Sequence, residues 1–391
     1  MTEQLSGNWN YPTQVRFGAG RLAEIGDGLA ELGITRPLVV TDAGLVSLPV
    51  IARLLELCAG AGRTAALFSG VDGNPVGGNV EAGIDAFRQG THDGVIAIGG
   101  GSALDVGKAI ALMAGQRCSL WDLEDVGDNW RRADAAAIAP CIAIPTTAGT
   151  GSEVGRSSVI TNEAERRKII VFHPGIVPDL VLCDPELTIS LPARLTAATG
   201  MDALSHNLEA WCARGFHPMA DGIALEGVRL VARHLRRAVA EPEDLEARAA
   251  MLAASLMGAT AFQKGLGAMH AMSHPIGARL GCHHGEINAV VMPYVLAHNL
   301  PAIDERLARL ARAIELPEPT ARGFVVWTVE LKAALGIPTT LAELGVPGDR
   351  VDELAAMAVV DPAGAGNPVP LNEADYVRLY RAALAGRLQG D

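Results

Sequence analysis

The sequence is poor in cysteine, aromatic residues and positive charge, and each shortage limits what the protein can be. Its 391 residues include only six cysteines, none in a CxxC pair, which argues against a disulfide framework or a zinc ribbon. Aromatic residues make up 4%, so the core must consist mainly of Ala, Leu, Val and Ile. The net charge of -12 argues against a general nucleic-acid or anionic-membrane surface.

Long apolar runs are also missing. No stretch approaches the roughly 18 residues of a membrane span, and the first residues show no basic region followed by an apolar core. We therefore expect a folded cytoplasmic protein with no membrane partner and no nucleic-acid partner. Hydrophobic residues at 49% and charged residues at 19% agree with a large buried interior.

The length suits two domains, and two types of periodicity divide the chain between them. Continuous apolar runs, as in strands buried on both faces of a parallel sheet, occupy 37–42, 94–98 and 140–144, with helical patterns at 21–32, 47–61, 79–88 and 103–114. From about Leu191 only helical periodicity remains, at 192–214, 218–238, 244–261, 265–280, 303–314, 319–335 and 350–359. We predict an α/β dinucleotide-binding domain over 1–188 and an all-helical metal-binding domain over 189–391.

The first domain contains two glycine-rich loops, each directly after a predicted strand. Gly99-Gly100-Gly101-Ser102 opens a helix, where backbone N–H groups can hold a pyrophosphate, although it is not the G-x-G-x-x-G fingerprint. The loop 144–153 offers threonine hydroxyls, or is only a turn and helix cap. Asp42 ends a strand, where its carboxylate can accept the adenosine ribose hydroxyls and favour NAD over NADP, or merely cap a loop.

The second domain brings together acidic and imidazole side chains at helical spacing. Asp202 and His206 lie four residues apart, as do His270 and His274, and His284 follows. A lone histidine on an apolar helix is more often a core or capping residue, but the joint pattern favours a metal site. One carboxylate with the imidazoles of His206, His270 and His284 suits a first-row ion such as Fe(II) or Zn(II).

Together these motifs resemble the iron-containing (group III) alcohol dehydrogenase family, which has a dehydroquinate-synthase-like fold. The likeness runs from Phe17 to Pro368 and is specific in five motifs: Gly-Gly-Gly-Ser-x-x-Asp at 99–105, Pro-Thr-Thr-Ala-Gly-Thr at 145–150, Thr199 to His206, His270 to Pro275, and His284-Gly-x-x-Asn-Ala. Two places depart from common members: His283 replaces a small residue or proline, and the linker 278–282 lacks an aromatic residue and carries Arg279.

The resemblance implies Fe(II) held by Asp202, His206, His270 and His284 in the cleft between domains, with His274 beside nicotinamide and substrate as a proton-handling catalytic group. It also implies a homodimer. On the cofactor side it implies that NAD is contacted by Asp42, Asn74, Gly100, Gly101, Ser102, Asp105, Thr146, Thr147, Thr150 and Lys168.

The predicted function is hydride transfer between an alcohol or aldehyde carbon and the nicotinamide. The alternatives are a zinc-dependent polyol dehydrogenase or a lyase on the same scaffold, which the third histidine argues against, a metal-dependent hydrolase without nicotinamide, and a non-catalytic sensor. The sequence does not identify the alcohol; Trp121, Trp130, Phe262, Arg279 and the segment 117–135 are candidates to shape the pocket.

Overall fold

A computed structural model describes residues 11–388 of the chain and divides them into two compact units. One contains Pro12–Thr147 and Gly151–Ser190, and is called the N-terminal unit below. The other, the helical unit, contains Tyr11, Ala148–Thr150 and the described residues from Leu191 onward. Each is described by itself.

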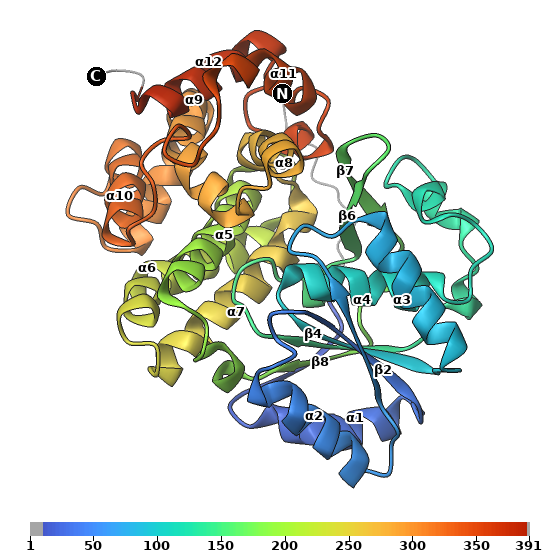
Figure 1. Ribbon diagram of the computed structural model, residues 1–391. Coiled ribbons are helices and arrows are strands. Elements are labelled where there is room, and N and C mark those ends of the chain that lie inside the picture. The colour runs from blue at the N-terminus through green and yellow to red at the C-terminus, as the bar shows by residue number, and fades with distance from the viewer. Residues whose placement is uncertain (1–10, 389–391) are drawn as a thin grey trace. The chain divides into compact units, whose positions relative to one another are not determined.

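A six-stranded parallel sheet forms the centre of the N-terminal unit (Figure 1). Its strand order is β1-β8-β5-β4-β2-β3. The strands are β1 (Gln14–Phe17), β2 (Pro37–Asp42), β3 (Ala66–Val71), β4 (Gly94–Gly99), β5 (Cys141–Pro145) and β8 (Leu180–Cys183). The central strands β4, β5 and β8 are buried throughout, which explains their unbroken apolar sequences.

Helices cover both faces of this sheet. On one face, alternate strand residues such as Val39, Ile96 and Ile142 form a buried core with α1 (Ile25–Glu31) and α2 (Pro49–Gly60). On the other face lie α3 (Gly77–Gln89) and α4 (Gly101–Met113). Gly107 lets α4 approach the sheet closely, since a Cβ there would lie 2.5 Å from the Cβ of Ala97. The predicted α/β fold is confirmed.

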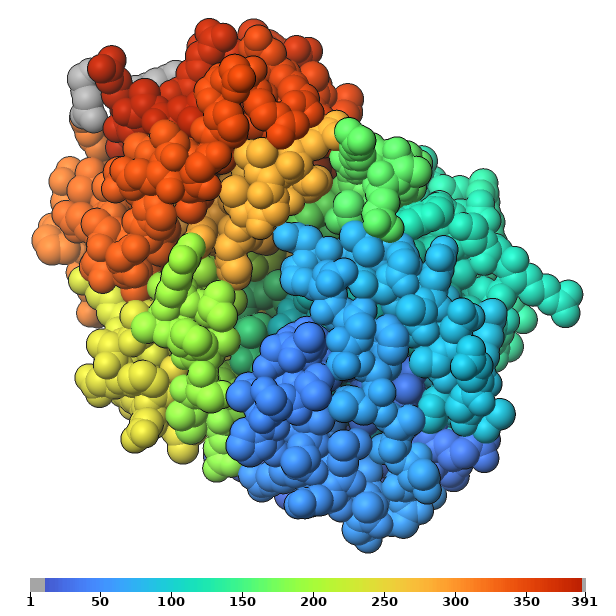
Figure 2. Space-filling view, in the orientation of Figure 1, coloured from blue at the N-terminus to red at the C-terminus, as the bar shows by residue number. Residues whose placement is uncertain are grey.

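A separate antiparallel hairpin of β6 (Ser157–Asn162) and β7 (Arg167–Phe172) adds to the predicted parallel sheet. Its alternating burial, with Ser158, Ile160 and Asn162 turned inward, belongs to a ribbon with one covered face. The segment between α4 and β5 contains only short 3-10 turns. Figure 2 shows this teal segment standing out from the surface of the N-terminal unit.

The helical unit is built around α5 (Ala193–Cys212), which is buried along most of its length. It packs against α6 (Pro218–Ala240), α7 (Leu245–Ala261) and α9 (His284–Ala313). The remaining helices are α8 (Ala268–Leu280), α10 (Ala321–Ala334), α11 (Val351–Ala358) and α12 (Glu373–Ala385). The predicted all-helical second half is confirmed. Among residues 11–388, no helix combines the length and apolar character needed to cross a membrane.

Candidate active site

The strand order of the N-terminal unit places the two predicted cofactor loops and Asp42 at neighbouring strand ends. Strands β2, β4 and β5 are adjacent and parallel, so Asp42, Gly99 and Pro145 end at one edge of the sheet. The chain passes from β2 to β3 on one side and returns to β4 on the other, which makes the β2–β4 junction a topological switch point. In open α/β sheets, ligands bind at the carboxyl ends of strands at such a point.

The first loop requires glycine at the end of β4. Gly99 has φ 146°, and a Cβ there would lie 2.7 Å from the Cβ of Ala103. Gly100 is the N-cap of α4 and lies beside Thr147, whose Cγ2 would be 3.4 Å from a Cβ at residue 100. The amide of Thr146 donates to the carbonyl of Gly99 over 2.9 Å. The structure thus joins both predicted loops at the positive end of a helix, where a phosphate is favoured.

Asp42, the last residue of β2, and Asn74, in the bend after β3, lie next to this loop. Asp42 Oδ1 accepts hydrogen bonds from the amides of Gly44 and Leu45, while Oδ2 would be 3.4 Å from a Cβ at Gly99. The carboxylate therefore stabilises a turn with one oxygen and approaches the glycine loop with the other. Ser102 Oγ donates to the carbonyl of Gly73, next to Asn74, so this hydroxyl fastens the 72–75 turn to α4.

Asp105 forms several contacts within the protein. Its carboxylate accepts from Ser152 Oγ over 2.5 Å and from the amide of Val159 over 3.0 Å, and lies 3.3 Å from Lys108 Nζ. Lys108 is fully buried and donates to the carbonyls of Ser152 and Ser157. These contacts connect α4 to β6, so the observed geometry gives Asp105 a structural role.

A buried carboxyl group beside this network was not predicted from the sequence. Glu153 is only 1% exposed, and its Oε1 has no hydrogen-bond partner within residues 11–388. Burial raises the pKa of Glu153 to about 7, although the nearby charge of Lys108 opposes the shift. Of the other predicted cofactor residues, Thr150 is grouped with the helical unit, and Lys168 lies in β7 opposite Thr161.

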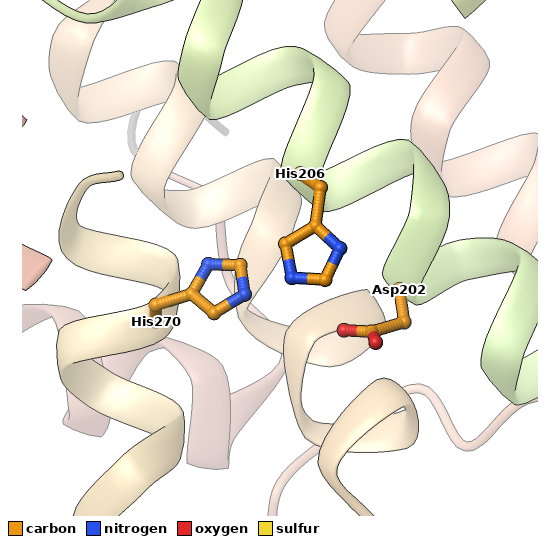
Figure 3. A group of neighbouring side chains, drawn as sticks. All are labelled: Asp202, His206 and His270. Carbon is orange, nitrogen blue, oxygen red and sulfur yellow. The ribbon is translucent and has the colours of Figure 1, made fainter. Parts of the chain in front are cut away.

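In the helical unit, Asp202, His206 and His270 bring one possible ligand atom each within 4.8 Å of one another. Asp202 and His206 come from adjacent turns of α5, and His270 comes from the first turn of α8 (Figure 3). All three side chains are buried. His284, the first residue of α9, extends this group, with Nε2 3.6 Å from Asp202 Oδ1. The structure therefore brings the four predicted metal ligands together.

Each of the three histidines has its Nδ1 beside a protein group. His206 Nδ1 lies 3.3 Å from the carbonyl of Gly149, His270 Nδ1 lies 2.6 Å from Glu209 Oε2, and His284 Nδ1 lies 3.3 Å from Ser273 Oγ. Because Ser273 donates its own proton to the His270 carbonyl, it accepts from His284. With Nδ1–H engaged in this way, Nε2 of each ring carries the lone pair that a metal requires.

The charge state of the imidazoles differs with their surroundings. Burial lowers the pKa of His206 to about 4, so this ring is neutral at neutral pH, as a metal ligand must be. Burial also acts to lower the pKa of His270, but the charge and hydrogen bond of Glu209 outweigh it, and the net shift is upward. The negative charge beside His270 therefore favours a cation in this place.

Asn288 provides a test of whether these residues fit a metal. Its Nδ2 lies 2.9 Å from Asp202 Oδ1, 3.2 Å from His284 Nε2 and 3.4 Å from His270 Nε2. An amide nitrogen has two hydrogens, so it cannot satisfy three acceptors. Its Oδ1 has no hydrogen-bond partner within residues 11–388. The converging basic atoms are those of a divalent transition-metal site, and the donor set fits Fe(II) or Zn(II).

His274 lies one turn after His270 and touches the same group of rings. Its ring stacks on His284 with centroids 5.6 Å apart, and its Nδ1 lies 2.9 Å from Asp361 Oδ2. His283 is exposed at the N-terminus of α9. Arg279 Nε is 3.1 Å from Glu353 Oε1 of α11, so its charge is paired.

Trp121 and Trp130, two of the residues predicted to shape the pocket, pack against other parts of the N-terminal unit. Trp121 lies against Gly77 at the start of α3, where a Cβ would be 2.6 Å from the indole. Trp130 packs edge-on against His173, with ring centroids 5.9 Å apart. Phe262 contacts the metal-site ring of His206, with centroids 5.2 Å apart. Phe262 is therefore an aromatic candidate that contacts a predicted ligand, His206.

Comparison with known proteins agrees with this geometry over both units. The family model described as iron-containing alcohol dehydrogenase matches residues 12–185, and that described as Fe-containing alcohol dehydrogenase family, C-terminal, matches 196–384. The chain is 40% identical over 385 residues to 4-hydroxybutyrate dehydrogenase of Cupriavidus necator, covering 96% of this chain and 99% of the relative.

Two solved structures are similar throughout. One is 1,3-propanediol oxidoreductase, with 34% identity, a TM-score of 0.92, and coverage of 97% of this chain and 100% of that one. The other is sulfoacetaldehyde reductase of Bifidobacterium kashiwanohense in complex with NAD+, with 31% identity, a TM-score of 0.88, and coverage of 99% and 100%. The chain therefore belongs to the iron-containing alcohol dehydrogenase family and is an oxidoreductase that acts on alcohols.

Proposed function

We propose that the protein is an NAD-dependent alcohol dehydrogenase and aldehyde reductase that uses Fe(II). Its metal would be held by Asp202, His206, His270 and His284. The observation that carries the metal site is the convergence of one carboxylate oxygen and two histidine Nε2 atoms on the single amide nitrogen of Asn288. His206 completes the set within 4.8 Å of Asp202 and His270.

Bound Fe(II) supplies a Lewis acid for the substrate oxygen, and bound NAD supplies the hydride acceptor or donor. The chain contributes orientation. Gly149, Glu209 and Ser273 hold the three ligand histidines by Nδ1. His274 donates Nδ1–H to Asp361, and so has Nε2 to accept the proton released when the alcohol is oxidised.

On the cofactor side, the proposal assigns the pyrophosphate to Gly100, Gly101 and Ser102, and the adenosine ribose to Asp42. The assignment is supported by the position of these residues, where the carboxyl ends of β2 and β4 meet the N-terminus of α4. An NAD-bound relative with the same fold gives independent support. Asn74, Asp105, Thr146, Thr147, Thr150 and Lys168 remain predicted contacts, and Asp105 also fixes α4 to β6.

The alternative of a zinc-dependent polyol dehydrogenase is less well supported. The carboxylate and two imidazoles of Asp202, His206 and His270, the neighbouring third imidazole of His284 and the family match favour the iron enzyme. The names of the relatives, a hydroxybutyrate dehydrogenase and a propanediol oxidoreductase, support a small alcohol with a second polar group as substrate. The protein is further proposed to be a cytoplasmic homodimer, in agreement with its six free cysteines and with the family likeness.

Anaerobic metal analysis, coupled to an NAD-linked screen of primary alcohols, diols, hydroxy acids and aldehydes, tests the proposal. We expect the purified enzyme to contain iron, to lose activity on chelation, and to recover more activity with Fe(II) than with Zn(II). Asp202→Ala should remove both metal and activity without unfolding the protein. A fully metallated, active Asp202→Ala variant would contradict the ligand assignment, and stronger recovery with Zn(II) would favour the zinc alternative.

A further inference from the structure

The helix that carries Asp202 and His206 also carries a second buried acid on the same side, Glu209. Glu209 follows His206 by three residues and Asp202 by seven, which places the three side chains along one face of α5. Glu209 is 5% exposed. An acidic side chain this deeply buried is costly unless charges or hydrogen bonds compensate for it.

Three donors converge on the Glu209 carboxylate, and all of them come from the start of α8. Oε2 accepts from the amide of Gly267 over 2.8 Å and faces His270 Nδ1 over 2.6 Å, while Oε1 accepts from the amide of Met269 over 2.7 Å. The first N–H groups of a helix have no partner inside the helix, and the helix dipole favours a negative charge there. Glu209 thus joins α5 to the N-terminus of α8.

The start of α8 is shaped for this carboxylate. A Cβ at Gly267 would lie 2.9 Å from Glu209 Oε1 and 2.9 Å from Asn367 Oδ1, so a side chain at residue 267 would displace one of these two groups. Asn367 accepts from the amide of Ala268 over 3.1 Å. The first three amides of this segment are therefore satisfied by two side chains, and only Glu209 also contacts a predicted metal ligand.

From these contacts we propose that Glu209 is a positioning residue for the metal site: its carboxylate fixes the ring orientation and the tautomer of His270, so that Nε2 is presented to the ion. The inference rests on the proposed function, because it assumes that His270 binds the metal. In this proposal Glu209 acts through His270, whose Nδ1 it contacts.

Glu209 is needed because an imidazole without a partner can adopt more than one tautomer and more than one orientation. A neutral ring can carry its proton on either nitrogen and can turn about its Cβ–Cγ bond. A carboxylate has no hydrogen to donate and can only accept, so Glu209 selects the form of His270 with the proton on Nδ1. Its own orientation is fixed in turn by the Gly267 and Met269 amides. Loss of such a carboxylate partner typically weakens metal binding about 10–100-fold.

Metal titration of the full-length apoprotein tests this directly. Co(II) is the probe, followed by its visible absorption and by competition with a chelator. Glu209→Gln keeps the size of the side chain but offers one oxygen, and its NH2 group would face one of the donors. Asn367→Ala is the matched control, because it also removes an acceptor from the α8 N-terminus but leaves the His270 contact intact. Thermal unfolding of each apoprotein measures the structural effect separately.

We expect Glu209→Gln to weaken Co(II) binding by ~10–100-fold and to alter the absorption bands. Asn367→Ala should destabilise the apoprotein and leave the Co(II) affinity unchanged. If Glu209→Gln does not fold, Glu209→Asp, which keeps the charge but retracts it by one methylene, should show weakened binding instead. A Co(II) affinity equal to that of the wild-type protein in these Glu209 variants would overturn the inference. It would also be overturned if the Glu209 variants lost as much Co(II) affinity and as much thermal stability as Asn367→Ala. Failure of the wild-type protein to bind Co(II) would instead contradict the proposed metal site.

Discussion

Nδ1 of His274 lies 2.9 Å from Oδ2 of Asp361, and the other oxygen of Asp361 accepts from the amide of Ala363 over 2.9 Å. Asp361 is thus both the partner of the proposed proton-handling histidine and the N-cap of the short turn Pro362–Gly366. The hydrogen bond from Ala363 fixes the orientation of the Asp361 carboxylate, and this carboxylate in turn fixes the orientation of the His274 ring. The sequence interval of 87 residues between the two side chains explains why no local motif predicts their contact.

Replacement of Asp361 by asparagine should slow turnover without removing metal. The amide can present NH2 to Nδ1, which favours the tautomer with the proton on Nε2 and blocks proton acceptance there. We expect kcat to fall by about tenfold or more, within the range of general acid–base effects, while metal content stays at the wild-type level. Asp134→Asn is the control, because Asp134 caps the turn Ala135–Ala137 in the same way. Wild-type kcat for Asp361→Asn would contradict the role of the pair.

Asp42 should determine the choice between NAD and NADP. Its Oδ1 holds a turn through Gly44 and Leu45, so a substitution changes both charge and local structure. Asp42→Asn keeps the acceptor but removes the charge that repels a 2'-phosphate, whereas Asp42→Gly removes both. Because placing like charges together costs several kcal/mol, we expect kcat/KM for NADP relative to NAD to rise at least about tenfold in both variants. An unchanged ratio in both would refute the assignment.

The sequence predicted elements well where one physical signal dominated. The buried strands β4 and β5 are predicted because both of their faces are covered and their sequences carry no polar side chain, and β2 is predicted from the apolar residues at 37–40. Five strands are not predicted. Strands β1 and β3 are partly exposed, β8 is apolar but only four residues long, and in β6 and β7 polar residues interrupt the apolar pattern of a hairpin with one buried face. Much of α9 was missed because Pro293 and Pro301, which usually end a helix, lie inside it.

The site was predictable to the extent that helical spacing carries it. Asp202 and His206 lie one turn apart on α5, and this local relation is visible in the sequence. The roles of Glu209, Asn288 and Asp361 are not predicted, although Asn288 lies in a motif named above. Their contacts with His270, Asp202 and His274 depend on which elements pack together. An acid on the same helix face as two predicted ligands, as Glu209 is with Asp202 and His206, is a sequence signal that could have identified a partner.

Buried Glu153 should make the stability of the N-terminal unit depend on pH. Burial raises its pKa from the ordinary 4.5 to about 7. As pH rises, Glu153 therefore loses its proton in the unfolded chain before it does so in the folded protein. Its contribution to the free energy of unfolding is full below pH 4.5 and declines as the pH rises toward 7. Relative to Glu153→Gln, the wild-type protein should lose up to about 3 kcal/mol between these limits.

Urea unfolding of both proteins at several pH values measures this loss. Glu81→Gln, at an exposed position of α3, removes one negative charge from the same unit and corrects for the change in net charge. If the difference between the wild-type protein and Glu153→Gln is the same at pH 5 and pH 8, the carboxyl group does not titrate in this interval and the expected coupling is wrong.

Two glycines of α6 should respond in opposite ways to alanine. Gly227 faces buried Asn207, which donates to the carbonyls of Ala203 and Ala254 and so joins α5 to α7. A Cβ at residue 227 would lie 2.0 Å from Asn207 Oδ1, whereas a Cβ at exposed Gly222 meets nothing within 4 Å. Gly227→Ala must therefore displace a hydrogen-bonded amide, at a cost of about 2 kcal/mol or more.

Gly222→Ala removes the same conformational freedom without a clash, so it should stabilise the protein by up to about 1 kcal/mol. Urea unfolding of the two variants in metal-free buffer measures both effects. Because Asn207 adjoins His206, Gly227→Ala should also weaken Co(II) binding, whereas Gly222→Ala should not. Equal stability changes in the two variants would show that α6 can shift away from α5, and that the Asn207 contact does not fix the helix on which two of the predicted ligands lie.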